Sequence, residues 1–403
     1  MSVDPILALL LAAAGASSVL YLLGLWAVRR HLRIPATDPG DPLPPVSIIK
    51  PVKGVEEAMD ENLQSVLAQR YPGPIEVVFS ATDPADPGLA LARAVAARHP
   101  HVPVRFVVSD PGFGRNPKVA NLAGAFAAAT HDLVWHSDAN VRVPPDYLRR
   151  IVAEMQASGA SLLTSIVVGT GERSVGAALE NVQLSAFIAP AMCTALHVGG
   201  VPCVVGKSML LRRSELDALG GLGRVRDVLA EDFVLGRDYA RAGRRVHVSA
   251  VPVVNVNERI PVRRFLERHA RWLKLRVTVH LGGWLADLGG NPVALLALAW
   301  LYSGLAAPLG TVLALAVVLK AAGDLDHVRR MRGEPLSIRW WWVLPVRDLV
   351  LAALFFYSAV SRTVCWRGVW MRIGRGSRIL EVRHAPLGPT RTDPVGAPAA
   401  LRG

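Results

Sequence analysis

The feature that most constrains the fold of this chain is an apolar segment near its start, residues 6–28, which carries no charged side chain. A helix of that length crosses the hydrocarbon core of a bilayer. Arg29 and Arg30 follow the segment and Asp4 precedes it, so the positive-inside rule places the next part of the chain in the cytoplasm. A cleaved signal peptide is the alternative, but it would have a basic start and a shorter apolar core. We therefore predict an uncleaved transmembrane anchor over residues 1–33.

A second hydrophobic region lies in the last third of the chain. Residues 292–319 are almost wholly apolar, and residues 340–361 are apolar and rich in Trp. A hairpin that bends at Pro308, followed by a re-entrant or interfacial 340–361, keeps the basic stretches of this region on the cytoplasmic side. A single straight span over 292–319 would instead export the basic loop that follows it. We predict a membrane region over residues 291–364.

Two charged residues within this region set a condition on its structure. Arg347 and Asp348 are tolerable at membrane depth only where protein shelters them. Farther on, residues 384–403 are rich in Pro, Gly and Ala, a composition typical of a disordered tail.

The overall charge of the chain bears on its partners. It has 45 Lys and Arg residues against 32 Asp and Glu, a formal net charge of +13. Basic chains often bind nucleic acid, but the hydrophobic ends favour contact with an anionic phospholipid surface, and we expect no nucleic acid partner. Cys193, Cys203 and Cys365 lack the spacing of metal ligands and indicate a reducing compartment. We expect a multi-pass protein of the cell inner membrane whose soluble domain is cytoplasmic.

Between the hydrophobic regions, the second half of residues 46–260 is less regular, but residues 46–136 alternate between strand-like and helix-like segments. This alternation predicts an α/β domain with a parallel, doubly wound sheet. Residues 184–206 are apolar but broken by Pro and Gly, and we expect them in the core or at the membrane surface. The predicted strands are 46–53, 75–80, 104–108, 133–136, 162–168, 208–212 and 246–251, and the predicted helices are 63–70, 89–99, 120–129 and 231–242.

A basic amphipathic helix is predicted over residues 262–276. Its apolar residues recur at helical spacing, and Arg and Lys residues fill most of the remaining positions. Such a helix beside membrane segments tends to lie in the membrane interface, although a solvated basic face on an ordinary helix is the alternative. We assign residues 261–290 to an interfacial amphipathic region.

The stretch Asp132-Leu-Val-Trp-His-Ser-Asp-Ala-Asn140 places polar residues directly after a buried strand. Asp138 therefore lies at the carboxyl end of a strand, where open α/β sheets bind their ligands. A divalent cation on a diphosphate needs one or two carboxylates there, because phosphate and water complete its coordination. Asp138 is the one carboxylate available beside Ser137 and Asn140. The alternative is an Asp that merely caps the turn into Pro144.

Further acidic and basic residues make a catalytic site the stronger interpretation. Asp83 follows the strand 75–80, Asp232 precedes an apolar helical segment, and Arg268 and Arg271 lie in the amphipathic helix. One carboxylate can accept hydrogen bonds from a nucleoside, one can bind a metal ion, and one can deprotonate an acceptor hydroxyl. An Arg pair is suited to holding a departing diphosphate.

In these motifs the chain resembles the ceramide glucosyltransferase family, a group of membrane-bound GT-A glycosyltransferases (family 21) that includes bacterial hopanoid-associated relatives. The resemblance runs from the first apolar segment to about residue 380, and the ordered set is far more specific than any single motif. It implies a GT-A, Rossmann-like nucleotide-sugar domain with transmembrane helices at both ends. The motifs are Lys50-Pro-Val-Lys-Gly54, Asn116-Pro-Lys-Val-Ala-Asn121, His136-Ser-Asp-Ala-Asn-Val-Arg-Val143, Glu231-Asp-Phe233 and Arg268-His-Ala-Arg-Trp272.

The resemblance implies a role for each site residue. Asp83 would contact the uridine, Asp138 would bind the diphosphate and a Mg²⁺ or Mn²⁺ ion, and Asp232 would be the catalytic base. The catalytic group would also include Arg268, Arg271 and Trp272, with Arg271 and Trp272 beside the diphosphate and acceptor. Lys53 and Lys118 resemble residues of the donor-binding loops. Asn140 stands where a strict Asp-x-Asp motif has its second acid, which leaves the number of protein ligands on the metal open.

The predicted reaction is an inverting transfer of a hexose from a UDP-sugar to a membrane lipid hydroxyl, giving a β-linked glycolipid. UDP-glucose and UDP-N-acetylglucosamine both remain open as donors, as do ceramide and a hopanoid as acceptors. A processive polysaccharide synthase of the same fold is the alternative, although three or four apolar segments are few for a translocation channel. A catalytically silent scaffold is disfavoured because all three acids and the Arg-Trp pair are present.

Overall fold

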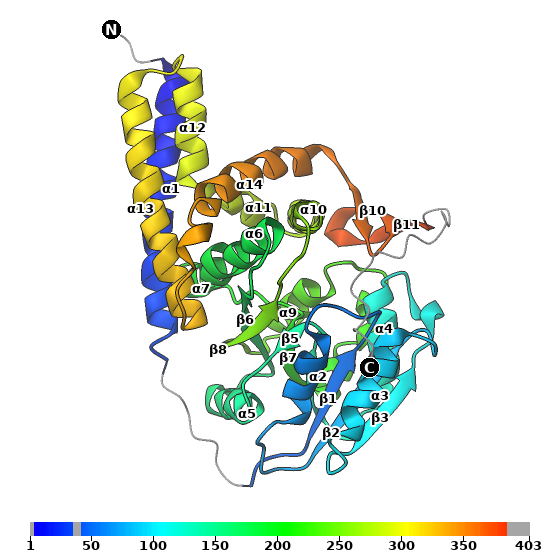
Figure 1. Ribbon diagram of the computed structural model, residues 1–403. Coiled ribbons are helices and arrows are strands. Elements are labelled where there is room, and N and C mark those ends of the chain that lie inside the picture. Colours follow the sequence, from blue (N-terminus) through cyan, green and yellow to red (C-terminus); the bar gives the residue numbers. More distant parts are fainter. Residues whose placement is uncertain (1–3, 35–41, 385–403) are drawn as a thin grey trace, which may run out of the picture.

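The computed structural model describes residues 4–34 and 42–384 as an α/β domain with a helical bundle standing at one side (Figure 1). The apolar segment near the start forms helix α1 (Pro5–His31), and Asp4 caps its first turn. Helices α12 (Pro292–Tyr302) and α13 (Ala307–Arg332) pack along α1. Among the described residues, three helices are long and apolar enough to cross a membrane, and a fourth span results if the bent pair α11 (Leu281–Gly289) and α12 counts as one. The predicted tail lies outside the described residues, apart from His384.

The centre of the α/β domain is an eight-stranded sheet in the order β3-β2-β1-β4-β7-β6-β8-β5. Strands β1, β2, β3 and β4 are mutually parallel, as predicted. The strands are β1 (Val46–Pro51), β2 (Ile75–Ala81), β3 (Val104–Val108), β4 (Leu133–Ser137), β5 (Val141–Arg142), β6 (Leu162–Thr170), β7 (Ser208–Arg212) and β8 (Val246–Val256).

The sheet as a whole is mixed: the predicted parallel arrangement holds for β1 to β4, and the rest of the sheet departs from it. Strand β7 runs antiparallel to both β4 and β6, and β5 runs antiparallel to β8. The reason is the connection before β7, which consists of α6 (Val175–Gln183), a π-helical turn (Leu184–Ile188) and α7 (Ala189–His197). This connection starts at the carboxyl end of β6 and does not cross back to the other edge, so the next strand must run in reverse.

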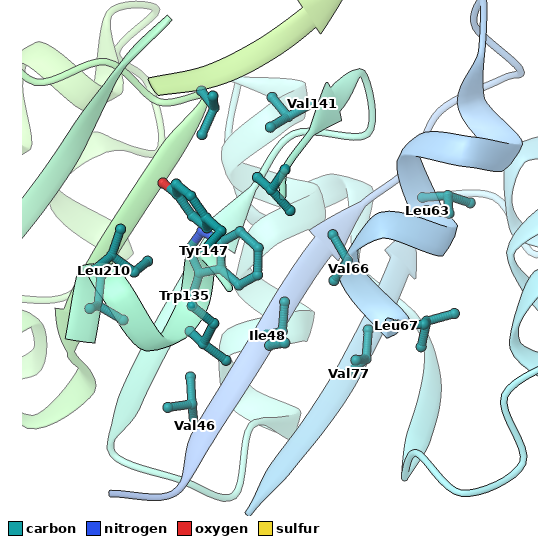
Figure 2. Packing of buried hydrophobic residues seen from close by; sticks show 14 of the residues in the cluster. Val46, Ile48, Leu63, Val66, Leu67, Val77, Trp135, Val141, Tyr147 and Leu210 are labelled. Atoms are coloured by element: carbon teal, nitrogen blue, oxygen red, sulfur yellow. The ribbon is translucent and has the colours of Figure 1, made fainter. Parts of the chain in front are cut away.

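Side chains from both faces of the sheet are buried under helices. Ile48 belongs to the core on one face and its neighbour Ile49 to the core on the other, as strand alternation requires. On the first face Trp135 packs against Tyr147 with ring centroids 5.2 Å apart (Figure 2). Trp135 Nε1 also donates a hydrogen bond to Ser208 Oγ at 2.9 Å, which joins β4 to β7.

The helices covering the sheet match most of the predicted segments. The first face carries α2, α3 and α5, and the second carries α4, α8 and α9. The apolar residues 184–206 contribute buried side chains to the core, which confirms one of the two predicted locations. These helices are α2 (Met59–Leu67), α3 (Pro87–Ala97), α4 (Pro117–Ala128), α5 (Tyr147–Ser158), α8 (Arg213–Ala218) and α9 (Glu231–Arg241).

The helices after β8 connect the α/β domain to the bundle. Helix α10 (Val262–Val279) confirms the predicted amphipathic helix, and its Phe265 is buried against α6 and α14 (Val343–Val360). Protein therefore covers the apolar face that was expected to meet the membrane. Helix α11 (Leu281–Gly289) leads into α12 with a bend of 69°.

The predicted hairpin is present, but its bend is not at Pro308. Helix α12 ends at Tyr302, and Pro308 lies in the first turn of α13, where proline is well tolerated. Helix α13 continues to Arg332, so much of the stretch expected as a loop is helical. Helix α14 lies across the α/β domain rather than along the bundle (Figure 1), an arrangement compatible with the interfacial placement that we predict.

A buried cluster of charges links α13 to α14 and supplies the shelter that Arg347 requires. Arg347 Nη2 lies 2.7 Å from Asp324 and 2.6 Å from Asp348. Lys320 Nζ lies 2.8 Å from Asp324 and 2.9 Å from Asp348, and Tyr21 of α1 donates a hydrogen bond to Asp324. Two cations and two anions therefore compensate each other where no bulk water does.

We expect Arg347→Leu to lower the stability of the detergent-solubilised protein by about 3–5 kcal/mol, because two buried carboxylates would then share Lys320 alone. Thermal unfolding measures the effect. Arg330→Leu is the control, since Arg330 pairs with Asp326 on an exposed face of α13, and this substitution should cost about 1 kcal/mol or less. Equal losses in the two variants would contradict a special role for the buried cluster.

The last described residues form a small antiparallel sheet that the sequence did not predict. It consists of β9 (Thr363–Trp366), β10 (Val369–Ile373) and β11 (Ile379–His384). The three strands are only four, five and six residues long, so the sequence before residue 384 gave no clear signal. A buried cluster including Met371 and Leu229 fixes this sheet to the segment that precedes α9.

Candidate active site

Three of the predicted site residues follow neighbouring parallel strands. Lys53 follows β1, Asp83 follows β2 and Asp138 follows β4, and these strands are adjacent in the order β2-β1-β4. Parallel neighbours end at the same edge of a sheet, which is where open α/β sheets place their ligands. The predicted position of Asp138 at the end of a buried strand is confirmed.

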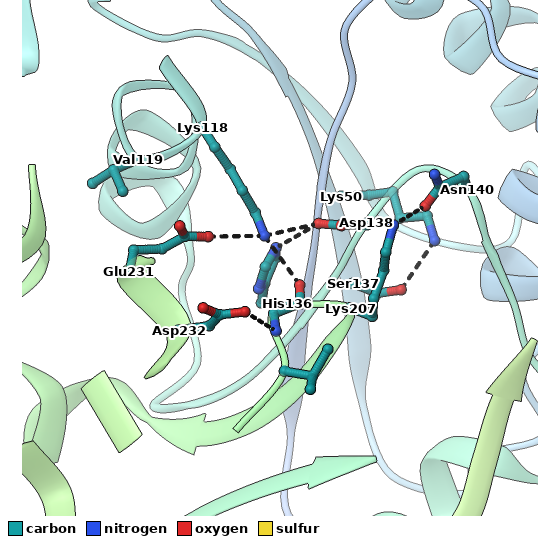
Figure 3. Close-up of polar contacts among 12 residues, drawn as sticks. Lys50, Lys118, Val119, His136, Ser137, Asp138, Asn140, Lys207, Glu231 and Asp232 are labelled. Atoms are coloured by element: carbon teal, nitrogen blue, oxygen red, sulfur yellow. Dashed lines mark hydrogen bonds and ion pairs between the residues drawn. The ribbon is translucent and has the colours of Figure 1, made fainter. Parts of the chain in front are cut away.

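Asp138 is the centre of a cluster of charges (Figure 3). Its Oδ1 lies 3.1 Å from Lys118 Nζ, and its Oδ2 lies 3.2 Å from Lys207 Nζ. Burial opposes the charge on Asp138, but the two ammonium groups outweigh it and hold its pKa well below the usual range. Asp138 is therefore an anion at every physiological pH.

Lys118 connects Asp138 to helix α9. It lies in the first turn of α4, which Asn116 caps by accepting hydrogen bonds from two backbone N–H groups. Lys118 Nζ is 3.0 Å from Glu231 Oε1 and donates to the carbonyl of Gly206 at 3.2 Å. Burial disfavours the ammonium, but Asp138 and Glu231 raise the pKa of Lys118 above its usual range. Lys118 is thus a permanent cation between two acids.

Lys50 lies beneath this cluster. Its Nζ donates to Ser137 Oγ at 3.1 Å and to the carbonyl of Val141 at 3.2 Å, so it ties β1 to the loop that carries Asp138. Burial lowers the pKa of Lys50 to about 7, although Asp138 opposes the shift. Lys50 therefore holds the loop in place while carrying only part of a charge near neutral pH.

The residues around Asp138 can hold a divalent cation only if a bound substrate supplies some of its ligands. Within the described parts of the chain, no group of three His, Cys, Asp or Glu side chains could hold a metal ion. One carboxylate suffices for Mg²⁺ when substrate phosphates supply other oxygens. The buried His136 Nε2 has no hydrogen-bond partner and lies 3.6 Å from Asp138 Oδ1, so a polar group is left over beside the carboxylate. This donor set suits a cation held jointly with a diphosphate.

Asp232 lies in the first turn of α9, on the other side of Lys118. Its Oδ2 accepts a hydrogen bond from the backbone N–H of Gly206 at 2.7 Å, and its Oδ1 accepts from Phe233 at 2.8 Å. A Cβ at Gly206 would lie 2.8 Å from Lys118 Nζ and 3.1 Å from Asp232 Oδ2, so a larger residue there would displace the ends of these two side chains. The helix N-terminus also favours the negative charge. Asp232 is half-buried, which leaves part of the carboxylate open to a substrate.

Glu231 is the neighbouring acid, but it is engaged differently. It is buried, and its carboxylate forms an ion pair with Lys118 and accepts a hydrogen bond from the side-chain amide of Asn116 at 3.4 Å. Burial raises the pKa of Glu231, Lys118 opposes the shift and Asp232 adds to it. Of the two acids, Asp232 is the more exposed.

Helix α10 carries Arg268 and Arg271, which differ in their partners. Arg268 Nη1 donates to Oε1 of the fully buried Glu180 at 2.7 Å, and His269 Nε2 lies 3.0 Å from Oε2 of the same carboxylate. Burial opposes ionisation of Glu180, but Arg268 and His269 lower its pKa to about 2. Arg268 is therefore held in an ion pair on α6.

Arg271 has no such partner. Within the described residues it makes no hydrogen bond or ion pair, and its guanidinium lies over the ring of Trp366 at 5.3 Å from the centroid. Burial, followed by the nearby Arg268, lowers the pKa of Arg271 to about 10, so it stays cationic at neutral pH. A half-buried cation without an anion is suited to binding one.

The remaining predicted residues lie at the margin of the cluster. Asp83 is exposed and accepts a hydrogen bond from the N–H of Ala85 at 2.9 Å. The side chain of Lys53 is also exposed. Trp272 is half-buried, packs edge-on against His269 with centroids 5.2 Å apart, and lines an apolar pocket with Phe187. The structure thus gathers Lys118, Asp138 and Asp232, and places no contact between these and Asp83 or Lys53.

Lys207 and Glu180 were missed in the sequence. Lys207 pairs with Asp138 and donates to Asn140 Oδ1 at 2.6 Å. It directly precedes β7, and because β7 is antiparallel to β4, the start of β7 meets the end of β4. A parallel β7 would have placed Lys207 at the opposite edge. Glu180 could not be recognised as a site residue from the sequence, since an acidic residue in an apolar helical segment can have many structural roles.

Comparisons with known proteins agree with this arrangement. A family model described as Glycosyl transferase family 21 matches residues 9–379. Ceramide glucosyltransferase 1 of Caenorhabditis elegans is 28% identical over 271 residues, which cover 65% of this chain and 56% of that protein. Ceramide glucosyltransferase 3 of the same organism is 24% identical, covering 84% and 74%. The Komagataella phaffii ceramide glucosyltransferase is 33% identical, covering 45% and 41%. The chain thus spans only about half of the first of these relatives.

The chain also aligns with solved structures. The mannosyltransferase PcManGT from Pyrobaculum calidifontis, in complex with GDP-Man and Mn²⁺, aligns with a TM-score of 0.48 at 20% identity, covering 87% of this chain and 99% of that one. S. aureus TarS aligns with a TM-score of 0.40 at 13% identity, covering 83% and 59%.

Proposed function

The chain belongs to glycosyl transferase family 21, and on this basis we propose that it transfers a hexose from a UDP-sugar to the hydroxyl of a membrane lipid. The resemblance seen in the motifs and the predicted GT-A fold class agree with that membership. The observation that carries the proposal is the half-buried carboxylate of Asp232 beside the cations that surround Asp138. A base and a diphosphate-binding group must lie this close for a single displacement at the sugar.

Each residue has a task in that displacement. Asp232 accepts the proton of the lipid hydroxyl as the hydroxyl attacks the sugar carbon, and the bond to UDP breaks on the opposite side. Lys118 and Arg271 stabilise the negative charge that develops on UDP. A divalent cation, Mg²⁺ or Mn²⁺, bound by Asp138 would add to this stabilisation. Attack from the opposite side inverts the anomeric carbon, so an α-linked donor gives a β-glycoside.

Membrane helices and the surroundings of Trp272 support a lipid as the acceptor. Three helices have the length and apolarity of membrane spans. Trp272 and the apolar pocket lie on the side of α10 that faces α11 and α14, next to those helices. Contact of the exposed start of α10 with an anionic phospholipid surface is part of this proposal; Arg263 there is paired with Glu267 at 2.7 Å. The acceptor would be ceramide, as the relatives' names suggest, or a hopanoid.

The test is incubation of the purified protein with radiolabelled UDP-glucose and UDP-N-acetylglucosamine, each offered with ceramide, a hopanoid polyol and a total lipid extract. We expect one donor to give a single labelled glycolipid with one sugar, identified by chromatography and mass spectrometry. A ladder of products of increasing length would instead indicate a processive polysaccharide synthase. Absence of UDP release with every lipid would contradict transferase activity.

We also predict that the site lies on the cytoplasmic side of the inner membrane. Arg29 and Arg30 follow the span in α1, which favours this orientation. In spheroplasts with an intact inner membrane, external protease should spare residues 46–260. Permeabilised spheroplasts are the control, in which the same segment should be cut. Ready cleavage without permeabilisation would place the site on the other face.

A further inference from the structure

The small C-terminal sheet reaches the candidate donor site through one hairpin. Strands β9 and β10 are joined by Arg367 and Gly368, which have φ values of +52° and +77°. Positive φ at both turn positions suits a two-residue hairpin, and it places the adjacent Trp366 and Arg367 at the tip. Gly368 adopts this conformation without strain. The hairpin tip, Trp366 and Arg367, is far from α10 in the sequence. In space it lies against α10, where Trp366 contacts Arg271.

Trp366 contacts the guanidinium that lacks an anion. Arg271 lies over the indole ring at 5.3 Å from its centroid and makes no hydrogen bond or ion pair within the described residues. Cation–π stacking fixes the plane of a guanidinium while leaving its N–H groups free at the edge. Trp366 therefore orients Arg271 without occupying the donors that an anion would need.

Arg367 contacts the loop that follows β1. Its Nη1 donates to the carbonyl oxygen of Lys53 at 2.5 Å, and its Nη2 pairs with Glu56. A guanidinium fork that bonds a backbone oxygen and a carboxylate at once fixes both. Asp86 holds the same loop from the other side, since its carboxylate accepts from the N–H of Gly54 at 2.8 Å.

The base of the sheet is attached to the segment that leads into α9. Ser377 accepts a hydrogen bond from the N–H of Leu229 through its carbonyl at 3.0 Å, and from Ala230 through its hydroxyl at 3.1 Å. Ala230 directly precedes the turn that carries Asp232. The sheet is thus anchored at its base, and its hairpin tip has a fixed position over α10 and the β1 loop.

We infer that Trp366 and Arg367 are positioning residues of the donor site: Trp366 orients Arg271 toward the diphosphate, and Arg367 holds the loop at Lys53 in its binding conformation. The inference rests on the proposed function, since it assumes that Arg271 meets the diphosphate of a UDP-sugar. It assigns to the C-terminal sheet the role of a wall of the donor site.

The first test measures UDP affinity of the full-length protein in detergent by calorimetry. Loss of one cation–π contact should weaken UDP binding by about 3- to 30-fold in Trp366→Leu. Trp366→Phe keeps an aromatic face and should recover most of the affinity. Trp370→Leu is the matched control, because Trp370 lies on the same hairpin and is 48% exposed. It should bind UDP as the wild type does.

The second test follows the loop itself by amide hydrogen exchange over residues 52–57. Arg367→Ala should raise exchange in this segment by at least about tenfold, because the contacts of the guanidinium with the Lys53 carbonyl and with Glu56 are lost, and it should weaken UDP binding. Arg367→Lys keeps the charge but not the fork, so it should restore protection only in part. Arg383→Ala, in an exposed pair on β11, is the control and should change neither quantity.

The outcomes separate the two ideas. Failure of the wild-type protein to bind UDP would overturn the proposed function. The hydrogen exchange over residues 52–57 would then still show whether Arg367 orders the loop. If the wild-type protein binds UDP, and Trp366→Leu and Arg367→Ala both bind it with the same affinity, the inference is overturned. The inference is supported if Trp366→Leu and Arg367→Ala bind UDP more weakly but are as thermally stable as the control variants, and if Trp366→Phe recovers the affinity. The weaker binding is then due to lost positioning of the site and not to poor folding.

Discussion

Asp232→Asn is expected to lower lipid glycosylation at least about a hundredfold while UDP-sugar affinity stays near normal. A lipid hydroxyl is a poor nucleophile at neutral pH, so its proton must leave as the new bond forms. The Asn side chain has nearly the same size but cannot take that proton. It can still accept one of the two backbone hydrogen bonds that Asp232 makes to Gly206 and Phe233, so the start of α9 should persist. Losing the other costs about 1 kcal/mol.

The measurements are transfer to lipid, UDP-sugar binding and slow hydrolysis of the donor by water, which should survive in the Asn variant. Glu231→Gln is the comparison, because Glu231 is buried on Lys118 and should affect donor binding more than proton transfer. Transfer at the wild-type rate by Asp232→Asn would remove Asp232 from the base role and make Glu231 the next candidate. Loss of UDP-sugar binding together with transfer would make Asp232 a structural residue.

Asp138→Ala should abolish transfer and remove the metal dependence of UDP binding. The substitution deletes the carboxylate that would bind a cation, and it leaves Lys118 and Lys207 facing each other without their common anion. Removing one electrostatic group of this kind typically costs on the order of 10²–10³ in rate. Transfer assays and UDP titrations with Mg²⁺, with Mn²⁺ and with EDTA measure the two effects.

Asp132→Ala is the control for Asp138→Ala. Asp132 lies just before β4, at the opposite end of that strand, where its carboxylate is largely exposed and accepts from the N–H of Ser214 at 2.8 Å. This variant should transfer sugar as the wild type does. Unchanged turnover of the wild type in EDTA would argue against a metal role, and metal-stimulated UDP binding in Asp138→Ala would move the cation site elsewhere.

The sequence by itself determined those features that depend on local patterns. Short runs of apolar residues that end in polar ones indicate buried strands, so β1, β2 and β4 and the position of Asp138 at a strand end followed from the local sequence. Apolar length marked α1 and the helices near the C-terminus as candidates to span a membrane. The presence of Arg347 within an apolar segment required a buried partner, which the structure supplies in Asp324 and Asp348.

Only the tertiary structure decided which distant residues meet at the site. The direction of β7 brought Lys207 to Asp138, and the packing of α6 on α10 engaged Arg268 with Glu180 and left Arg271 without an anionic partner among residues 4–34 and 42–384. The contact between Arg367 and Lys53 joins residues 314 positions apart. Periodicity records which face of an element is buried but not which element covers it. Strand direction and side-chain pairing across the fold depend on how the elements pack, and no local pattern carries that information.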